Sequence, residues 1–143
     1  MKRIFIALIG LWFLALTAAC LVKPEGPVKI QPGQSFELRP VEGMNTAVLE
    51  DQLSLKLVAV NDSRCPEGVL CVHAGWGTLS LELEDSNGKQ AVELRFGAGP
   101  EEEQTLSLGE YRLSVQDVQP YPVYEKTVPA DQQIVTFVLE KQP

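Results

Sequence analysis

The stretch that decides the fold is residues 78–96, TLSLELEDSNGKQAVELRF, in which two alternating segments flank a short polar turn. Apolar side chains at every second position lie on one side of a strand, so each segment predicts a β-strand with one buried face. Between the segments stands the pair Asn87-Gly88, which favours a tight hairpin turn because it accepts positive φ. The stretch therefore predicts an antiparallel hairpin with one apolar and one polar face.

The same alternation recurs along most of the remaining chain. Four further segments show it, at residues 36–38, 53–57, 111–115 and 135–139, and shorter runs at 46–49 and 104–108 predict two more strands. No segment after residue 33 repeats apolar residues with a helical period. About eight short strands predict an all-β fold, a single antiparallel, immunoglobulin-like β-sandwich over residues 34–143, with a small barrel as the alternative.

The first twenty residues have the features of an export signal. Lys2 and Arg3 precede an uncharged apolar segment at 4–16, and the small residues 17–19 precede Cys20. A basic head, an apolar segment and small residues before a cleavage site are typical of a secretory signal peptide, so we expect a signal helix over residues 1–19. The apolar run is nearly long enough to span a bilayer, so an uncleaved anchor stays open, as does an ordinary secreted product.

A cysteine directly after these small residues resembles the lipobox of bacterial lipoproteins. The resemblance implies cleavage before Cys20 and acylation of its thiol, with palmitate or a similar fatty acid, so that an N-terminal lipid attaches the protein to a membrane of the cell envelope. In a Gram-negative source it implies the outer membrane, because Leu21 stands where an Asp commonly signals inner-membrane retention. Residues 20–33 would form a tether, since their three prolines and two glycines disfavour a helix. Two alternatives stay open: an N-terminal arm packed on the domain, and a C-terminal end of this segment that runs into the first strand.

Charge narrows the choice of partner. Removal of the first 19 of 143 residues leaves 124, which suits one domain, and it changes the net charge from −7 to −9 because it removes Lys2 and Arg3. An acidic chain without a cluster of basic residues fits nucleic acid poorly, and anionic lipid headgroups would repel it. We therefore expect the lipid to do the anchoring, no nucleic-acid partner, no cofactor and a monomer.

Three cysteines are an odd number for an exported chain. If Cys20 carries lipid, Cys65 and Cys71 remain to form a disulfide in an oxidising compartment. Such a bridge would close a short loop and stabilise the fold by about 2–2.5 kcal/mol. A redox-active pair is disfavoured, because the spacing is not that of a C-x-x-C motif.

The segment at residues 62–75, DSRCPEGVLCVHAG, resembles one found in small exported bacterial proteins of uncharacterised function. In those proteins Asp-Ser-Arg-Cys-Pro is followed by Cys-Val-Trp-Ala-Gly and then a β-strand. This chain carries His73 where they usually carry Trp. The resemblance covers these 14 residues and implies export and a β-rich fold, but no activity.

Four residues are candidates for a binding surface: Arg64, Trp76, Tyr121 and Tyr124. The first two belong to or follow the cysteine-containing segment, and the tyrosines lie in a segment whose prolines exclude a central strand. Arginine and aromatic side chains are enriched at binding surfaces.

Each candidate also has a purely structural interpretation. Arg64 would pair with Asp62 or Glu67, Trp76 would pack over the disulfide or the edge of the sandwich, and the two tyrosines would cover the open end of the core. Asp62 would also cap the turn by accepting a bond from a backbone N–H group.

The leading hypothesis is a non-enzymatic envelope lipoprotein that binds a protein or glycan, or has an accessory structural role. A periplasmic copper or zinc site made by Cys65, Cys71 and His73 is the first alternative, although His73 is the only histidine and an oxidised pair offers no thiolate. A hydrolase that uses Ser63 and His73 with Asp62 is the second alternative, resting on residue types alone.

Overall fold

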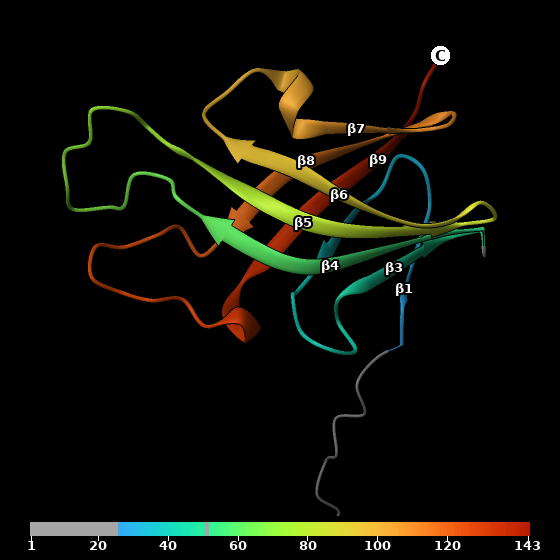
Figure 1. Cartoon of the computed structure of the whole chain (residues 1–143), viewed down its shortest axis with the longest axis horizontal. Helices are drawn as coiled ribbons and strands as arrows, with labels where there is room; N and C mark the ends of the chain where they lie inside the picture. Colours follow the sequence, from blue (N-terminus) through green and yellow to red (C-terminus); the bar gives the residue numbers. More distant parts are fainter. Residues whose placement is uncertain (1–25, 51) are drawn as a thin grey trace, which may run out of the picture.

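A computed structural model describes residues 26–50 and 52–143, and the predicted signal peptide and Cys20 lie outside these ranges. The described chain folds into two stacked β-sheets, which lie one behind the other in Figure 1. One sheet has five strands in the order β1-β3-β4-β5-β6, and the other has four in the order β2-β9-β8-β7. The prediction of an all-β sandwich is thereby confirmed. Among the described residues, no helix has the length and apolar character needed to cross a bilayer.

The elements follow the alternating segments of the sequence closely. The five-stranded sheet contains β1 (Val28–Ile30), β3 (Thr46–Leu49), β4 (Leu53–Asp62), β5 (Trp76–Asp85) and β6 (Gly88–Gly97). The four-stranded sheet contains β2 (Ser35–Leu38), β7 (Thr105–Leu108), β8 (Tyr111–Gln119) and β9 (Ile134–Lys141). Two short 3-10 turns, η2 (Glu101–Gln104) and η3 (Ala130–Gln132), precede β7 and β9.

The hairpin of β5 and β6 forms as the sequence predicts. Asp85 pairs with Gly88 across a two-residue turn, and the Asn87 backbone N–H donates to Oδ1 of Asp85 at 2.7 Å. Every second residue of β5 is buried, from Leu79 to Leu83, and these side chains belong to the single apolar core between the sheets. Removing this apolar area from water is the main force that holds the two sheets together.

The C-terminal strand β9 lies inside its sheet, between β2 and β8. Its side chains Val135, Phe137 and Leu139 are completely buried, and the Phe137 ring stacks on Phe36 of β2 with 5.5 Å between centroids. The strand predicted over residues 135–139 is thereby confirmed.

The domain begins earlier than the sequence analysis predicted. The predicted boundary at residue 34 is too late, because Val28–Ile30 form β1 and pair in parallel with β3. Ile30 is buried in the core, and the Gly33 N–H donates to the Leu139 carbonyl at 2.7 Å. The flanking prolines are compatible with β1, since it is an edge strand and pairs on one side only.

The parallel pairing of β1 with β3 is also an exception to the predicted antiparallel arrangement. The strand order differs from the ABED and CFG order of the immunoglobulin constant domain. The likeness to immunoglobulin domains is therefore in the layered architecture and not in the order of strands.

Two β-bulges shift the alternation of the strands that lead to one end of the sandwich. In β4 the register shifts between Leu57 and Ala59, and in β8 it shifts between Val115 and Asp117. One extra residue in a strand moves all following side chains to the opposite face. The shift in β8 is followed by the buried Val118, and the shift in β4 determines how the residues just before the disulfide are oriented.

Candidate functional site

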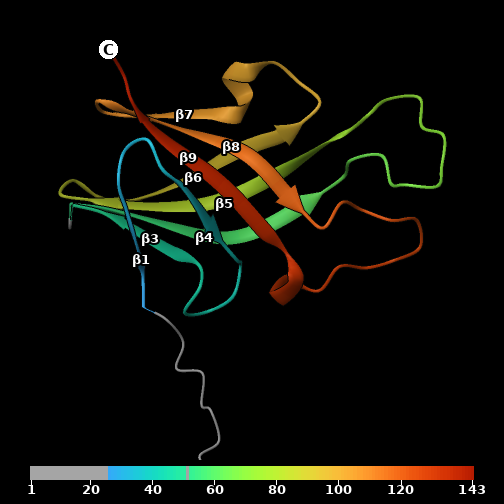
Figure 2. The same ribbon diagram turned by 180° about the vertical axis from the view of Figure 1, so that it is seen from behind.

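The two loops singled out in the sequence lie together at one end of the sandwich. The β4–β5 loop (residues 63–75) and the β8–β9 loop (residues 120–133) extend side by side from this end in both views (Figure 2). The Glu67 N–H donates to the Pro122 carbonyl at 2.9 Å, and the Tyr124 N–H donates to the Glu67 carbonyl at 3.3 Å. We call residues 63–75 and 120–133 the loop end. Sequence reasoning found both loops but not their contact, because no local pattern encodes it.

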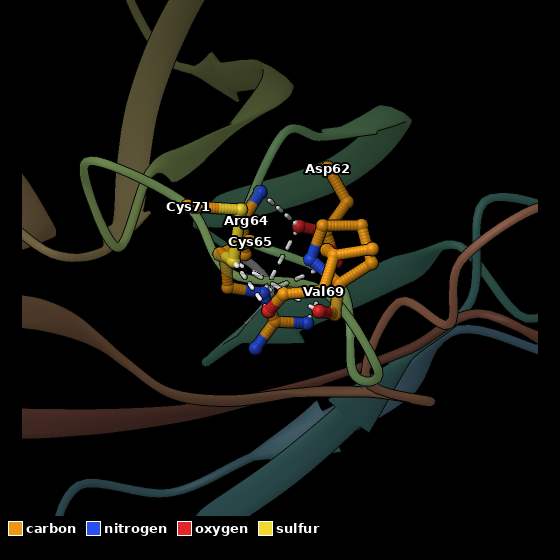
Figure 3. Close-up of a disulfide and its surroundings, with 6 residues drawn as sticks. Asp62, Arg64, Cys65, Val69 and Cys71 are labelled. Carbon is orange, nitrogen blue, oxygen red and sulfur yellow. Dashed lines mark hydrogen bonds and ion pairs between the residues drawn. A yellow bond between two sulfur atoms is a disulfide. The ribbon is translucent and has the colours of Figure 1, made fainter.

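The predicted disulfide between Cys65 and Cys71 is confirmed, with 6.0 Å between the two Cα atoms (Figure 3). Backbone hydrogen bonds close the same loop at its base. The Cys65 N–H donates to the Ala74 carbonyl at 2.7 Å, and the Ser63 N–H donates to the Trp76 carbonyl at 3.2 Å. The β4–β5 loop is therefore held by a covalent bond, by its own backbone and by the neighbouring loop.

At the loop end, the Arg64 side chain contacts residues of both sheets. Its Nε donates to Oδ1 of Asp62 at 3.0 Å and its Nη2 donates to Oδ2 at 2.7 Å, which makes a bidentate pair (Figure 3). The same Nη2 donates to the Val118 carbonyl of β8 at 2.8 Å. The guanidinium carbon lies 4.5 Å from the Tyr121 ring centroid and 5.1 Å from that of Phe96. Arg64 thus joins β4, β6 and β8.

The pair of Arg64 and Asp62 is largely removed from solvent. The Arg64 side chain is 10% exposed and the Asp62 side chain is 13% exposed. The bulge in β4 accounts for the position of Asp62, because the one-residue shift reverses the face on which that side chain lies. The Arg64 N–H also donates to Oδ1 of Asp62, so this carboxylate caps the turn. With Nε and Nη2 bound inside the domain and only 10% of its side chain exposed, Arg64 organises the loop end and presents little of itself to a ligand.

Two glycines make room for this arrangement. Gly75 has φ of +72°, and a Cβ on it would collide with the Ser63 carbonyl oxygen. Gly77 pairs with Phe96, and a Cβ there would collide with the Phe96 ring, which lies against Arg64. The close approach of chain segments at the loop end therefore requires glycine at both positions.

The loop end carries most of the exposed apolar side chains. Of the seven large hydrophobic residues that are exposed in the described part of the chain, five belong to this end or border it: Leu70, Val72, Trp76, Tyr121 and Tyr124. Leu70 and Val72 flank Cys71 and are 105% and 93% exposed. Sequence reasoning named the aromatic residues but missed these two. Their exposure could have been predicted, because a loop closed by two cysteines six residues apart is too short to bury two aliphatic side chains.

Trp76 lies at the end of the sandwich where β5 begins, next to the edge strand β6. The Arg95 guanidinium of β6 lies 5.4 Å from the Trp76 ring centroid, and Arg95 also pairs with Glu103 at 2.7 Å. Of the two packing positions expected from the sequence, the contact with Arg95 corresponds to the sheet edge. The half-exposed ring adds aromatic surface beside the disulfide loop.

Most residues proposed for the metal site or for the hydrolase make other contacts in this structure. Cys65 and Cys71 share a disulfide, so neither offers a thiolate to a metal ion. The Asp62 carboxylate is bound to Arg64, and within the described residues no hydrogen bond joins Ser63 to His73. In this structure the two cysteines are therefore not available as thiolate ligands, and the described Ser63, His73 and Asp62 are not joined by hydrogen bonds as a triad.

A cleft of about 1270 Å³ lies at the opposite end of the sandwich. It is lined by residues 48–50, 52–54, 83–90 and 106–111, which belong to three connections between strands and which we call the turn end. Its apolar lining comes mainly from the leucines at the ends of the strands: Leu49, Leu53, Leu83, Leu106 and Leu108. No site residue was predicted at this end, because the sequence pattern of these turns indicates only connections between strands.

The charged groups at the turn end form exposed pairs. Lys141 Nζ lies 2.8 Å from Oε2 of Glu110, and this contact raises the pKa of Lys141 and lowers the pKa of Glu110. Burial, followed by the negative charge of Glu110, raises the pKa of the neighbouring Tyr111. Lys141 and Glu110 bind each other in open solvent, where such pairs contribute little to stability.

No protein-family model, curated protein or solved structure matches this chain. The resemblance of residues 62–75 to small exported bacterial proteins stays a prediction, and the geometry of the loop end is the best guide to function.

Proposed function

We propose that this protein is a lipoprotein of the bacterial cell envelope, whose β-sandwich is a non-enzymatic binding or accessory module that acts through its loop end. The observation that carries the proposal is that two loops that are hydrogen-bonded to each other carry or border five exposed apolar side chains: Leu70, Val72, Trp76, Tyr121 and Tyr124. Contiguous exposed apolar surface is typical of interaction sites.

The rigidity of the loop end supports a binding role. The disulfide, the bond between Glu67 and Pro122 and the stacked Arg64 all fix the backbone that carries the apolar side chains. A surface that is ordered before binding loses little conformational entropy when a partner arrives, so more of the contact energy appears as affinity.

The location in the envelope is supported by the export signal and by the cysteine count. With Cys65 and Cys71 paired, Cys20 is the remaining cysteine of the chain, and it stands at the lipobox position. Disulfides persist in oxidising compartments outside the cytosol, which agrees with export.

The test is the covalent structure of the N-terminus. The full chain is expressed in a bacterium, and the intact mass of the purified protein and of its N-terminal peptide is measured for wild type and Cys20→Ala. We expect the wild-type chain to begin at residue 20, to carry fatty acids and to sediment with membranes, and the variant to lack the acyl groups. A wild-type chain that retains residues 1–19, or one cleaved without acylation, would contradict the proposal.

A further inference from the structure

We infer that the loop end docks on the lipid surface itself, with Leu70 and Val72 entering the boundary between headgroups and acyl chains. The inference rests on the proposed function, because the lipid on Cys20 is what brings the domain to the bilayer. It deepens that proposal by naming the partner of the exposed apolar surface.

The order of side chains along the loop fits a bilayer interface. The two fully exposed aliphatic residues, Leu70 and Val72, flank Cys71 in the middle of the loop, away from the strands. The aromatic Trp76 lies at the base of the loop and Tyr124 lies on the neighbouring loop. Aliphatic side chains favour the hydrocarbon region, whereas Trp and Tyr favour the level of the headgroups. The loop end therefore presents aliphatic side chains in the middle of the disulfide loop, and aromatic side chains at the base of that loop and on the neighbouring loop.

The charge of the loop favours neutral lipid over anionic lipid or a charged partner. Between Cys65 and Gly75, Glu67 is the only Asp, Glu, Lys or Arg, and His73 is the only histidine. The chain has no basic cluster, and its net charge without the first 19 residues is −9. Docking therefore depends on apolar contact with zwitterionic lipid and does not weaken when salt is added.

The direction of β1 is compatible with an anchor on the side of the loop end. β1 runs parallel to β3, and β3 runs away from the loop end, because the chain turns from β3 into β4 at the opposite end of the sandwich. The N-terminal end of β1, at Val28, therefore faces the loop end along the strand direction.

The chain before β1 is long enough for Cys20 to reach the level of Asp62, just before the loop end. Val28 is level with Leu55 along the strands, because both residues pair with Ala47. Asp62 lies seven residues farther along β4, which is about 23 Å at a rise of about 3.3 Å per residue. The eight residues from Cys20 to Val28 span at most about 29 Å when fully extended. A lipid on Cys20 can thus reach the level at which the loop end begins.

Docking would add to a lipid anchor that is weak when it consists of one acyl chain. Burial of an exposed Leu or Val side chain is worth about a tenfold change in an equilibrium constant when the side chain enters only the interface. We therefore expect Leu70→Asn and Val72→Asn each to weaken docking about tenfold.

The experiment uses Trp76 as a built-in probe. The chain has two tryptophans, and cleavage before Cys20 removes Trp12. The lipid-modified protein is purified and reconstituted into phosphatidylcholine vesicles that contain acyl-chain-brominated lipid, and the quenching of Trp76 fluorescence is measured. We expect quenching in wild type that 0.5 M salt does not reduce, and its loss in the double variant Leu70→Asn/Val72→Asn. The matched control is Val58→Asn, an exposed valine on the β4 bulge, which should behave as wild type.

A second measurement reports on the loop itself. His73 is the only histidine and follows Val72, so modification by diethyl pyrocarbonate adds one mass increment whose rate measures exposure. We expect wild-type His73 to react more slowly on vesicles than in the double variant.

The outcomes separate the two proposals, because intact mass is measured on the same sample. A lipid-modified chain whose Trp76 is quenched equally in wild type and double variant, or in neither, overturns the docking inference and leaves the loop end to a protein or glycan partner. A chain without the acyl mass overturns the proposed function, and the docking inference falls with it.

Discussion

The two ends of the sandwich close the same two sheets in opposite ways. At the loop end, long connections are fixed by a disulfide, by hydrogen bonds between loops and by Arg64 stacked between two aromatic rings. At the turn end, short turns join the strands around an open cleft, and the charged groups pair in solvent. The difference shows that order at the loop end comes from contacts distant in sequence, whereas order at the turn end comes from the turns themselves.

The two ion pairs express this difference most clearly. The Arg64–Asp62 side chains are 10% and 13% exposed, whereas the Lys141–Glu110 side chains are 62% and 59% exposed. Both pairs have a short N–O distance, 2.7 Å and 2.8 Å. A charge that is held away from water requires its partner, whereas an exposed charge is screened and solvated without one. Distance alone therefore says little about how much each pair matters.

The largest expected effect is that of Asp62→Ala. The substitution leaves the Arg64 guanidinium without its carboxylate in a largely buried position, and we expect the free energy of unfolding to fall by about 3–5 kcal/mol. Urea denaturation of wild type and variant measures the change. The matched control is Glu110→Ala, which removes the carboxylate of the exposed pair and should leave stability nearly unchanged. Equal effects of the two substitutions would contradict the distinction between the ends.

A smaller effect is expected for Gly75→Ala, with Gly109→Ala as its matched control. Both glycines have positive φ, +72° and +62°, so both substitutions strain the backbone by about 1 kcal/mol. A Cβ at Gly75 also collides with the Ser63 carbonyl, whereas nothing lies within 4 Å of one at Gly109. We therefore expect losses of about 2–4 kcal/mol at Gly75 and about 1 kcal/mol at Gly109, measured by thermal and urea unfolding. A loss at Gly109 that matches the one at Gly75 would contradict the tight closure of the loop end.

Most strands could be predicted from the sequence, because a sheet with one buried face has a side-chain period of two. The period predicts the β5–β6 hairpin and the β9 strand, and the short β3 at Thr46–Leu49 has the expected bounds. β1 could not be predicted, since Val28–Ile30 is too short to show a period and lies among prolines. The bulge at Val58 was hidden as well, because a run of apolar residues at 57–60 conceals a shift by one.

The site was less predictable than the fold, because its decisive contacts link distant parts of the chain. The disulfide followed from counting cysteines, and Asp62 was one of two partners considered for Arg64. The rings around Arg64 come from Phe96 and Tyr121, on separate segments far along the chain. No local pattern indicates that a charged residue lies between them, so sequence reasoning placed Arg64 on the surface.

The smallest expected effect concerns the pH dependence of the turn end. The hydrogen bond with Lys141 lowers the pKa of Glu110 below its ordinary value of 4.5. The folded state therefore binds this proton less readily than the unfolded state, so the pair stabilises the fold above pH 4.5 and its contribution is lost as the pH falls through the lowered pKa.

Lys141 sets the alkaline limit of the same pair. Its pKa is raised above 10.5, so its contribution is present below pH 10.5 and is lost as the pH rises through the raised pKa. We expect Glu110→Gln to remove a small stability change at each extreme of pH, measured by urea unfolding from pH 3 to 11. We expect 1 M salt to have the same effect in wild type, because the Debye length is then about 3 Å. A salt-resistant difference between wild type and Glu110→Gln would mean that the turn end holds its charges as the loop end does, away from solvent.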